Sequence, residues 1–146
     1  MDGETAYVPA GFSQELVVQW SDTDAAGHHH HTAIARFAEA TEAAWMRALA
    51  LPDYFGRAPR VRYEVDYLDR LFFGQSVRVT LRITHVGTSS LHFAFEVWAL
   101  DDQGDPTVRA AAGKYVTVHA SDATSSASPW PPLWRERLTA AADAPR

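Results

Sequence analysis

The chain has 146 residues, 47% of them hydrophobic, and a formal net charge of -5. This length predicts one domain with a sizeable core, and the acidic balance argues against a nucleic-acid-binding surface. The absence of cysteine excludes disulfides, thiol nucleophiles and cysteine-ligated metal sites. No apolar stretch approaches the roughly 18 residues of a membrane span, and the acidic start Met1-Asp2-Gly3-Glu4 lacks the positive region of a signal peptide. We therefore expect a soluble, cytoplasmic protein.

The hydrophobic period changes once in the first part of the chain. Residues 12–20 alternate between apolar and polar side chains, which predicts a strand. Between residues 34 and 49 the apolar side chains instead recur at three- and four-residue steps, which predicts a helix of about five turns with one buried face. We expect it to begin at His31 or Thr32 and to end at the run Leu51-Pro52-Asp53.

Alternation returns further along the chain and predicts antiparallel strands. They are expected at about residues 61–67, 77–84, 91–97 and 108–119, with a hairpin loop at 101–105. Gly113 lies within the last of these segments and predicts a bulge or a bend there. One helix can cover only one face of a sheet, yet residues 92–98 carry large side chains on both faces. We therefore expect part of the remaining surface to contact another subunit.

The order of the elements predicts an α+β fold. Residues 1–120 are expected to form the main domain. Residues 121–129 are a Ser/Ala-rich linker, and a short tail helix is expected around residues 131–142. We expect the whole segment 121–146 to pack on the same domain.

The loop before the predicted long helix carries a candidate for chemistry. Asp24 lies three residues before Gly27, and the helix begins soon afterwards. The first N–H groups of a helix have no partners within it, and the helix dipole there favours negative charge. A carboxylate facing such an end can attack a carbonyl while the amides stabilise the oxyanion. Asp24 could instead simply cap the turn, and Asp22 is expected to form turn hydrogen bonds or salt bridges.

These segments resemble the hotdog-fold thioesterases of the 4-hydroxybenzoyl-CoA thioesterase family. The resemblance spans about residues 12–138 and is most specific in the run 22–27, followed by a helix that carries Phe37 and Glu39. Three further segments support it: residues 65–77, the turn at 87–91 and the proline-rich residues 129–133. It implies a hotdog fold, in which a five-stranded antiparallel sheet wraps around one long helix and the chain dimerises.

The resemblance also implies an activity, which is hydrolysis of an acyl-CoA thioester to a free acid and CoA. The second aspartate of the D-x-D motif is the catalytic carboxylate of the family, which corresponds to Asp24, and Gly27 completes the catalytic turn. The oxyanion is held by a backbone N–H at the start of the helix, at His31 or a neighbour. Asp24 would either attack the carbonyl or activate a water, and both roles stay open. No cofactor is implied beyond the CoA of the substrate.

Family members are homodimers or homotetramers with active sites between subunits, so substrate-binding residues are expected from separate segments. Glu39 could orient a partner or water, or form a salt bridge. Ser89 and Ser90 could bind the thioester or a water from the facing subunit, or could stabilise their own turn. Arg60 is one of several arginines that could hold the CoA phosphates.

Four consecutive histidines, His28 to His31, follow the glycine turn. Four adjacent residues in one turn cannot all bind one ion, so we predict no metal site. We expect the histidines to line the acyl pocket or the subunit interface, with His30 contacting substrate, and to make the pocket polar and sensitive to pH. Two alternative functions stay open: a thioesterase acting on an acyl carrier protein, and a non-catalytic acyl-thioester-binding protein.

Overall fold

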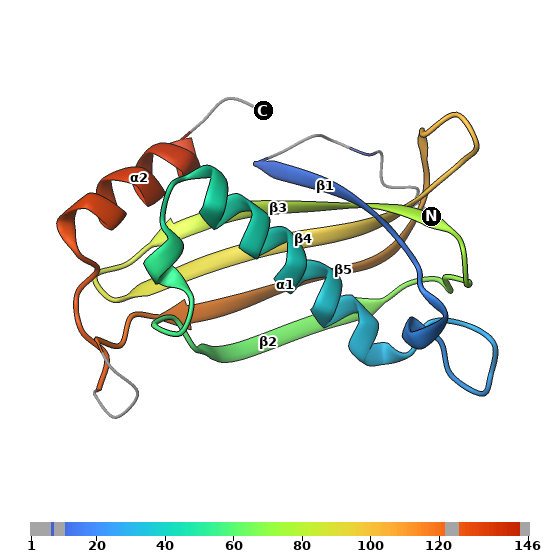
Figure 1. The fold of residues 1–146 in the computed structure, drawn as a ribbon, viewed down its shortest axis with the longest axis horizontal. Coiled ribbons are helices and arrows are strands. Elements are labelled where there is room, and N and C mark those ends of the chain that lie inside the picture. The colour runs from blue at the N-terminus through green and yellow to red at the C-terminus, as the bar shows by residue number, and fades with distance from the viewer. Residues whose placement is uncertain (1–6, 8–10, 122–125, 144–146) are drawn as a thin grey trace.

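A five-stranded antiparallel sheet packs against the long helix α1 in the computed structural model, which describes residues 7, 11–121 and 126–143 (Figure 1). The strands lie in the order β1-β3-β4-β5-β2. Their bounds are β1 Phe12–Val17, β2 Arg60–Tyr67, β3 Ser76–Val86, β4 Ser90–Leu100 and β5 Pro106–Val118, and the helices are α1 His31–Ala48 and α2 Pro132–Asp143. The α+β architecture and the antiparallel sheet are as the sequence predicts, and α2 adds a second helix to the long one.

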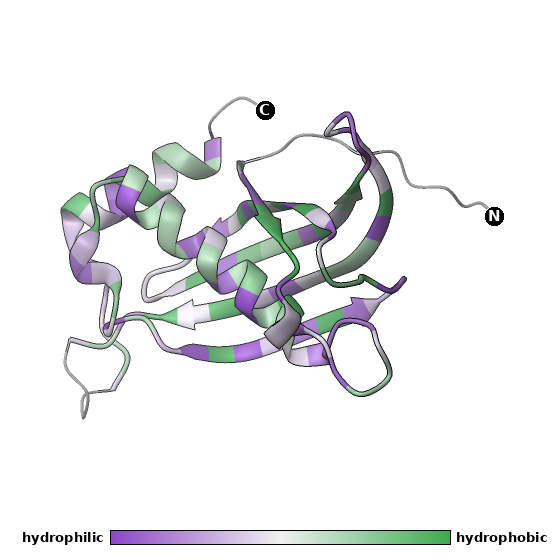
Figure 2. Ribbon diagram, turned by 45° about the vertical axis from the view of Figure 1, so that its right-hand side comes forward, coloured by the Kyte–Doolittle hydropathy of each residue, from purple (hydrophilic) through white to green (hydrophobic). Residues whose placement is uncertain are grey.

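The core lies between α1 and the covered face of the sheet. Helix α1 buries Ile34, Phe37 and Trp45, three of the residues whose spacing predicted the helix. On β3 and β4 alternate residues are buried, namely Val77, Val79, Leu81, Ile83, Leu91, Phe93, Phe95 and Val97, and Thr80, Trp98, Ala99 and Leu100 are buried in addition. Each valine, leucine, isoleucine or phenylalanine among them contributes about 1.5–3 kcal/mol when it leaves water. Figure 2 shows the alternation of hydrophobic and hydrophilic residues along the strands.

The first strand is shorter than predicted. It ends at Val17, and residues Trp20–Asp22 form a single 3-10 turn. The chain turns here because the Asp22 carboxylate accepts a hydrogen bond from the Gln19 N–H (2.8 Å), which ends the extended backbone. Trp20, at the end of the segment 12–20 predicted as a strand, is consequently 78% exposed.

Gly113 forms no bulge, so of the two alternatives predicted for it the bulge is wrong. It pairs in register with Val65 on one side and Phe95 on the other. A Cβ at this position would lie 2.4 Å from the Glu64 carbonyl oxygen and 2.6 Å from the Phe95 ring. Glycine is therefore needed because Phe95 and the backbone of β2 fill the space above it.

Strand β2 forms an edge of the sheet that α1 leaves largely uncovered. Its apolar side chains Val61, Tyr63 and Tyr67 are 59%, 36% and 47% exposed. Two aromatic residues after β2, Phe72 and Phe73, are also exposed. This edge carries much of the exposed hydrophobic surface of the described residues.

Helix α2 extends the fold beyond the C-terminal end of α1 (Figure 1). Its Leu138 is fully buried, and the Arg137 guanidinium donates to the Ala50 carbonyl oxygen (2.8 Å) just after α1. Trp130, in the segment that leads into α2, is buried and donates its indole N–H to the Ser90 carbonyl oxygen (3.0 Å). Of the predicted linker 121–129, residues 122–125 lie outside the described residues. No helix in the described ranges is long and apolar enough to cross a membrane.

Candidate functional site

The loop before α1 is anchored to the helix through Asp22. This residue is buried, and its carboxylate forms an ion pair with Arg36 of α1. Its backbone carbonyl accepts the His30 N–H (2.6 Å). These contacts match the hydrogen bonds and salt bridge expected of Asp22, and they hold the loop between residues 22 and 30 against the start of the helix.

Asp24 closes a tight turn inside this loop and remains exposed. Its carboxylate oxygen Oδ1 accepts the Ala26 N–H (2.8 Å), and its backbone carbonyl accepts the Gly27 N–H (3.0 Å). Gly27 has a φ of +87°, in the left-handed region, which explains why a glycine stands here. The turn-forming alternative for Asp24 is therefore realised, and it leaves the carboxylate at the surface.

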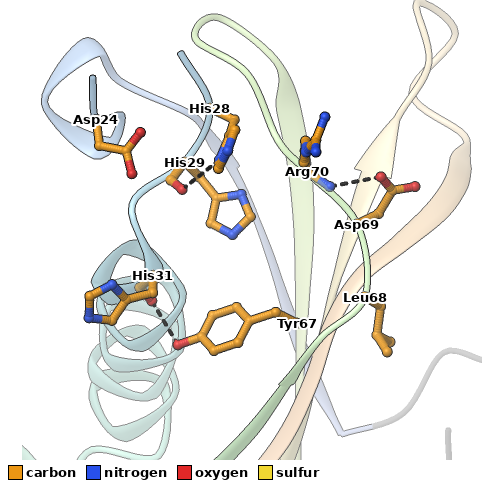
Figure 3. A pocket seen from close by; sticks show the side chains of 8 residues that line it. All are labelled: Asp24, His28, His29, His31, Tyr67, Leu68, Asp69 and Arg70. Carbon is orange, nitrogen blue, oxygen red and sulfur yellow. Dashed lines mark hydrogen bonds between the residues drawn. The ribbon is translucent and has the colours of Figure 1, made fainter. Parts of the chain in front are cut away.

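The same carboxylate borders an open pocket of about 550 Å³ (Figure 3). The pocket lies between the start of α1 and the segment that follows β2. Its lining residues are Asp24, His28, His29, His31, Tyr67, Leu68, Asp69 and Arg70. The Tyr67 hydroxyl donates to the His31 carbonyl oxygen (3.0 Å), so it joins the end of β2 to the first turn of α1. Tyr67, Leu68, Asp69 and Arg70 were not among the predicted site residues, although they lie in the segment 65–77 that supports the resemblance.

His30 caps α1, and its ring is not part of the pocket lining. Its Nδ1 accepts the Thr32 N–H (3.2 Å), and its carbonyl accepts the Ala33 N–H (2.9 Å). Among the described residues, the N–H of His31 has no hydrogen-bond acceptor. The free amide and the positive end of the helix dipole thus lie beside the pocket that Asp24 borders.

His29 is the buried member of the four histidines, with 7% of its surface exposed. Its backbone N–H donates to the Leu71 carbonyl oxygen (2.7 Å), and its ring Nδ1 accepts the Leu71 N–H (3.0 Å). Burial, reinforced by the neighbouring His28, lowers the pKa of His29 below its ordinary value. The imidazole is therefore neutral at pH 7. The pattern of four histidines gave no sign of which ring would be buried.

A second cluster of ionisable side chains lies further along α1. The Glu42 carboxylate is buried and accepts hydrogen bonds from the hydroxyls of Tyr54 (2.6 Å) and Tyr115 (2.8 Å). It also forms an ion pair with Arg60 of β2, whose guanidinium lies 4.5 Å from the centre of the Tyr115 ring. Burial and the adjacent Glu42 raise the pKa of both tyrosines well above their ordinary value. This cluster borders a smaller pocket of about 300 Å³.

The remaining predicted substrate-binding residues lie away from Asp24 within one chain. Arg60 is seven residues from Tyr67 along β2, or roughly 23 Å at the rise of a strand, and Glu39 contacts its guanidinium (3.3 Å). Ser89 and Ser90 lie where β4 begins, and Ser90 pairs with Val118 near the end of β5. The structure thus brings Asp24, Gly27 and His31 together and leaves Arg60, Glu39 and both serines towards the other end of the sheet.

Metal binding has no evident basis in the part of the chain that the structure describes. No group of three or more histidine and carboxylate side chains there is arranged to hold an ion. The rings of His28 and His29 have their centres 6.0 Å apart. Nδ1 of His30 accepts the Thr32 N–H at the helix N-cap.

The chain matches one protein family and resembles several solved structures. The model of the thioesterase-like superfamily matches residues 18–138. A thioesterase from Thermus thermophilus, crystallised with coenzyme A and Zn, is 28% identical, with a TM-score of 0.77 over 92% of this chain and 98% of that one. A predicted thioesterase from Bacillus stearothermophilus is 29% identical, with the same TM-score and the same coverage.

A more distant structure shares the fold alone. A 1,4-dihydroxy-2-naphthoyl-CoA thioesterase from Synechocystis is 19% identical, with a TM-score of 0.75 over 88% of this chain and 95% of that one. Among the curated proteins, none matches the chain by sequence. The family match and the solved structures agree on one architecture.

Proposed function

The chain belongs to the thioesterase-like superfamily, and from this premise we propose that it hydrolyses an acyl-CoA thioester with Asp24 as its catalytic carboxylate. One observation carries the proposal. An exposed carboxylate and a helix N-terminus with a free amide, that of His31, border the same open pocket. Thioester hydrolysis needs these two groups, one to deliver the nucleophile and one to stabilise the oxyanion.

In the general-base form of the reaction, Asp24 removes a proton from a water whose oxygen attacks the thioester carbonyl carbon. The electron pair of the C=O bond moves to the oxygen, and the resulting oxyanion is stabilised by the His31 amide and the helix dipole. The oxyanion then collapses, the C–S bond breaks, and the thiolate takes the proton back from Asp24. The products are a free acid and CoA. In the nucleophilic form, Asp24 itself attacks and water hydrolyses the mixed anhydride.

These two forms differ in the fate of the water oxygen. A single turnover in H₂¹⁸O, with enzyme in excess over substrate, followed by mass spectrometry of the Asp24 peptide, tests for the nucleophilic form, which ¹⁸O in that peptide would establish. In the nucleophilic route, water that attacks Asp24 Cγ of the anhydride puts ¹⁸O into the Asp24 carboxylate. The general-base route labels the acid product alone.

We also propose that two copies of the chain associate. The edge strand β2 exposes Val61, Tyr63 and Tyr67, and an edge strand with exposed apolar side chains is suited to pairing with another copy. Ser89, Ser90 and Arg60 are remote from Asp24 within one chain, so they would reach substrate only from the facing subunit. Light scattering coupled to gel filtration tests this association, and a monomer at micromolar concentration contradicts it.

Coenzyme A is the proposed carrier because the Thermus thermophilus relative was crystallised with it. Arg70, at the pocket, supplies a positive charge suited to a CoA phosphate. An acyl carrier protein remains the alternative carrier, and parallel assays with the same acyl group on CoA and on the carrier protein separate the two.

The central experiment is a thiol-release assay across short, medium, long and aromatic acyl-CoAs. We expect turnover by the wild-type protein and its loss in the Asp24→Asn variant. Asp66→Asn is the matched control, because Asp66 is also exposed and precedes the pocket residue Tyr67. Normal turnover by Asp24→Asn contradicts the catalytic role, and tight binding of a CoA analogue without turnover of any thioester favours a non-catalytic binding protein.

A further inference from the structure

His29 forms two hydrogen bonds with the backbone of one residue, Leu71, one through its own backbone and one through its ring. Its backbone N–H donates to the Leu71 carbonyl oxygen (2.7 Å), and the Leu71 N–H donates back to ring atom Nδ1 (3.0 Å). Leu71 is itself fully buried, which fixes the backbone that makes these contacts. The orientation of the His29 ring is therefore set by the fold before any substrate binds.

The contact with Leu71 also determines which ring nitrogen carries the proton. A backbone N–H can only donate, so Nδ1 must be the acceptor and must be unprotonated. In a neutral imidazole the proton then lies on Nε2. Figure 3 shows this second nitrogen turned toward Tyr67 and the first turn of α1, and the rings of His29 and Tyr67 lie 6.3 Å apart between centres.

The surroundings of His29 keep the ring neutral. Burial lowers the pKa of the imidazole, and the neighbouring His28 and His30 lower it further, whereas Asp24 opposes them. Tyr67, on the β2 side, is uncharged at pH 7 because the ordinary pKa of a tyrosine hydroxyl is about 10, and burial raises its pKa further. A neutral imidazole N–H can polarise a carbonyl without giving up its proton, which suits a permanent donor in an acyl-transfer site.

We propose that His29 Nε2–H is a second hydrogen-bond donor for the thioester oxygen, acting alongside the amide at the start of α1. This inference rests on the proposed function, because it assigns a role within the same pocket that Asp24 borders. It gives His29 a task that differs from those of its neighbours, since His30 caps the helix. The oxyanion would then be held by one backbone donor and one side-chain donor.

A purely structural role for His29 makes the opposite prediction for two amide variants. In His29→Asn, the side-chain oxygen can take the position of Nδ1 and accept the Leu71 N–H, while nothing replaces the Nε2 donor. In His29→Gln, the longer side chain brings an N–H₂ group to the position of Nε2 and loses the contact with Leu71. The two variants therefore separate the donor from the structural contact.

The test combines kinetics, thermal unfolding and ¹⁵N NMR of the full-length protein. We expect His29→Asn to lose about 100-fold in kcat with little change in KM, as for a donor that acts in the transition state, while its Tm stays close to wild type. His29→Gln should keep more of kcat and have the lower Tm. In the wild-type protein, the imidazole ¹⁵N shifts at pH 7 should show Nε2 protonated and Nδ1 unprotonated.

Three results would overturn the assignment. They are wild-type kcat in His29→Asn, a lower kcat in His29→Gln than in His29→Asn, and a proton on Nδ1 in the NMR spectrum. The NMR measurement needs no activity and no folded variant. A wild-type protein that hydrolyses no thioester would remove the proposed function and this role together, whereas an active enzyme with unimpaired His29→Asn would remove only the role of His29.

Discussion

Two carboxylate clusters, one on helix α1 and one in the loop before it, differ in how completely their charge is satisfied. Towards the C-terminal half of α1, Glu42 is buried and contacts Tyr54, Tyr115 and Arg60. Before its N-terminus, Asp24 is exposed, and its side chain accepts one backbone hydrogen bond, from Ala26. Both oxygens of the Glu42 carboxylate have hydrogen-bond donors, whereas the Asp24 carboxylate borders an open pocket.

The difference separates a structural carboxylate from one available for chemistry. A buried charge must be paired and hydrogen-bonded, so the partners of Glu42 are committed to it and removing it leaves them unsatisfied in the interior. An exposed carboxylate keeps its hydration and can exchange water for substrate at little cost. We therefore expect Glu42 variants to affect stability first and Asp24 variants to affect activity first.

The largest effect is expected for Asp24→Asn. Loss of the carboxylate should lower kcat by about 10³-fold, within the range of general acid–base catalysis. Asparagine can still accept the Ala26 N–H and maintain the turn, so we expect a Tm close to wild type. Steady-state thiol release and a thermal melt on the same preparation give both values. A large fall in Tm would mean that Asp24 acts mainly as a turn residue.

Glu42→Ala is expected to give the inverse result. It leaves Arg60 and two tyrosine hydroxyls without their shared acceptor, which should lower the free energy of unfolding by about 3–5 kcal/mol. Urea unfolding followed by tryptophan fluorescence measures the change. Glu39→Ala is the matched control: Glu39 also contacts Arg60, but its side chain is 65% exposed, so we expect a loss below about 1 kcal/mol. Equal losses in the two variants would contradict the distinction between the clusters.

Tyr115→Phe removes one hydrogen-bond donor from Glu42. A hydrogen bond to a charged group contributes about 1.5–3 kcal/mol, and the ring itself, with its contacts to Phe93, is retained. We expect the free energy of unfolding to fall by about 2 kcal/mol and kcat to stay near wild type. An effect on kcat as large as that of Asp24→Asn would show that the two clusters are coupled.

The smallest expected effect is a pH dependence of stability at the pocket. The pKa of folded His29 is lowered by burial and by His28, so below about pH 6.5 the unfolded chain binds a proton that the folded chain does not. Stability from this group is therefore full above pH 6.5 and falls as the pH decreases towards the folded pKa. Urea unfolding of wild type and His29→Asn at several pH values isolates the effect, because the wild type should lose stability relative to the non-titrating variant as the pH falls.

Much of the fold followed from local sequence patterns. The helix period between residues 34 and 49 and the alternation from Val77 to Ile83 predicted elements that the structure contains. The prediction was wrong where a side chain determined the backbone path. The contact from Asp22 ended β1 early, and the Phe95 ring explained Gly113 without a bulge. Both contacts depend on where a side chain points, which hydrophobic spacing does not encode.

The candidate site was predictable only in its first part. The run of residues 22–27 before a helix indicated Asp24 and the helix amide, because both are close in the chain. The roles of the histidines were not predictable: four identical residues in a row became a helix cap at His30, a buried ring that accepts the Leu71 N–H at His29, and pocket lining at His28 and His31. Their differences come from Thr32, Leu71 and Tyr67, and two of these are more than thirty residues away.

The order of the elements, the thioesterase-like resemblance and the position of a carboxylate next to a helix N-terminus could all be predicted from the amino-acid sequence. Each of these depends on neighbours in the chain, whose geometry follows from local periodicity and turn chemistry. Only the tertiary structure decided which carboxylate is satisfied and which is available. Glu42 meets its partners across 12, 18 and 73 residues, and the proton of His29 is located by a backbone N–H 42 residues away. Such contacts form only when the sheet closes against α1, which is why hydrophobic patterning could not reveal them.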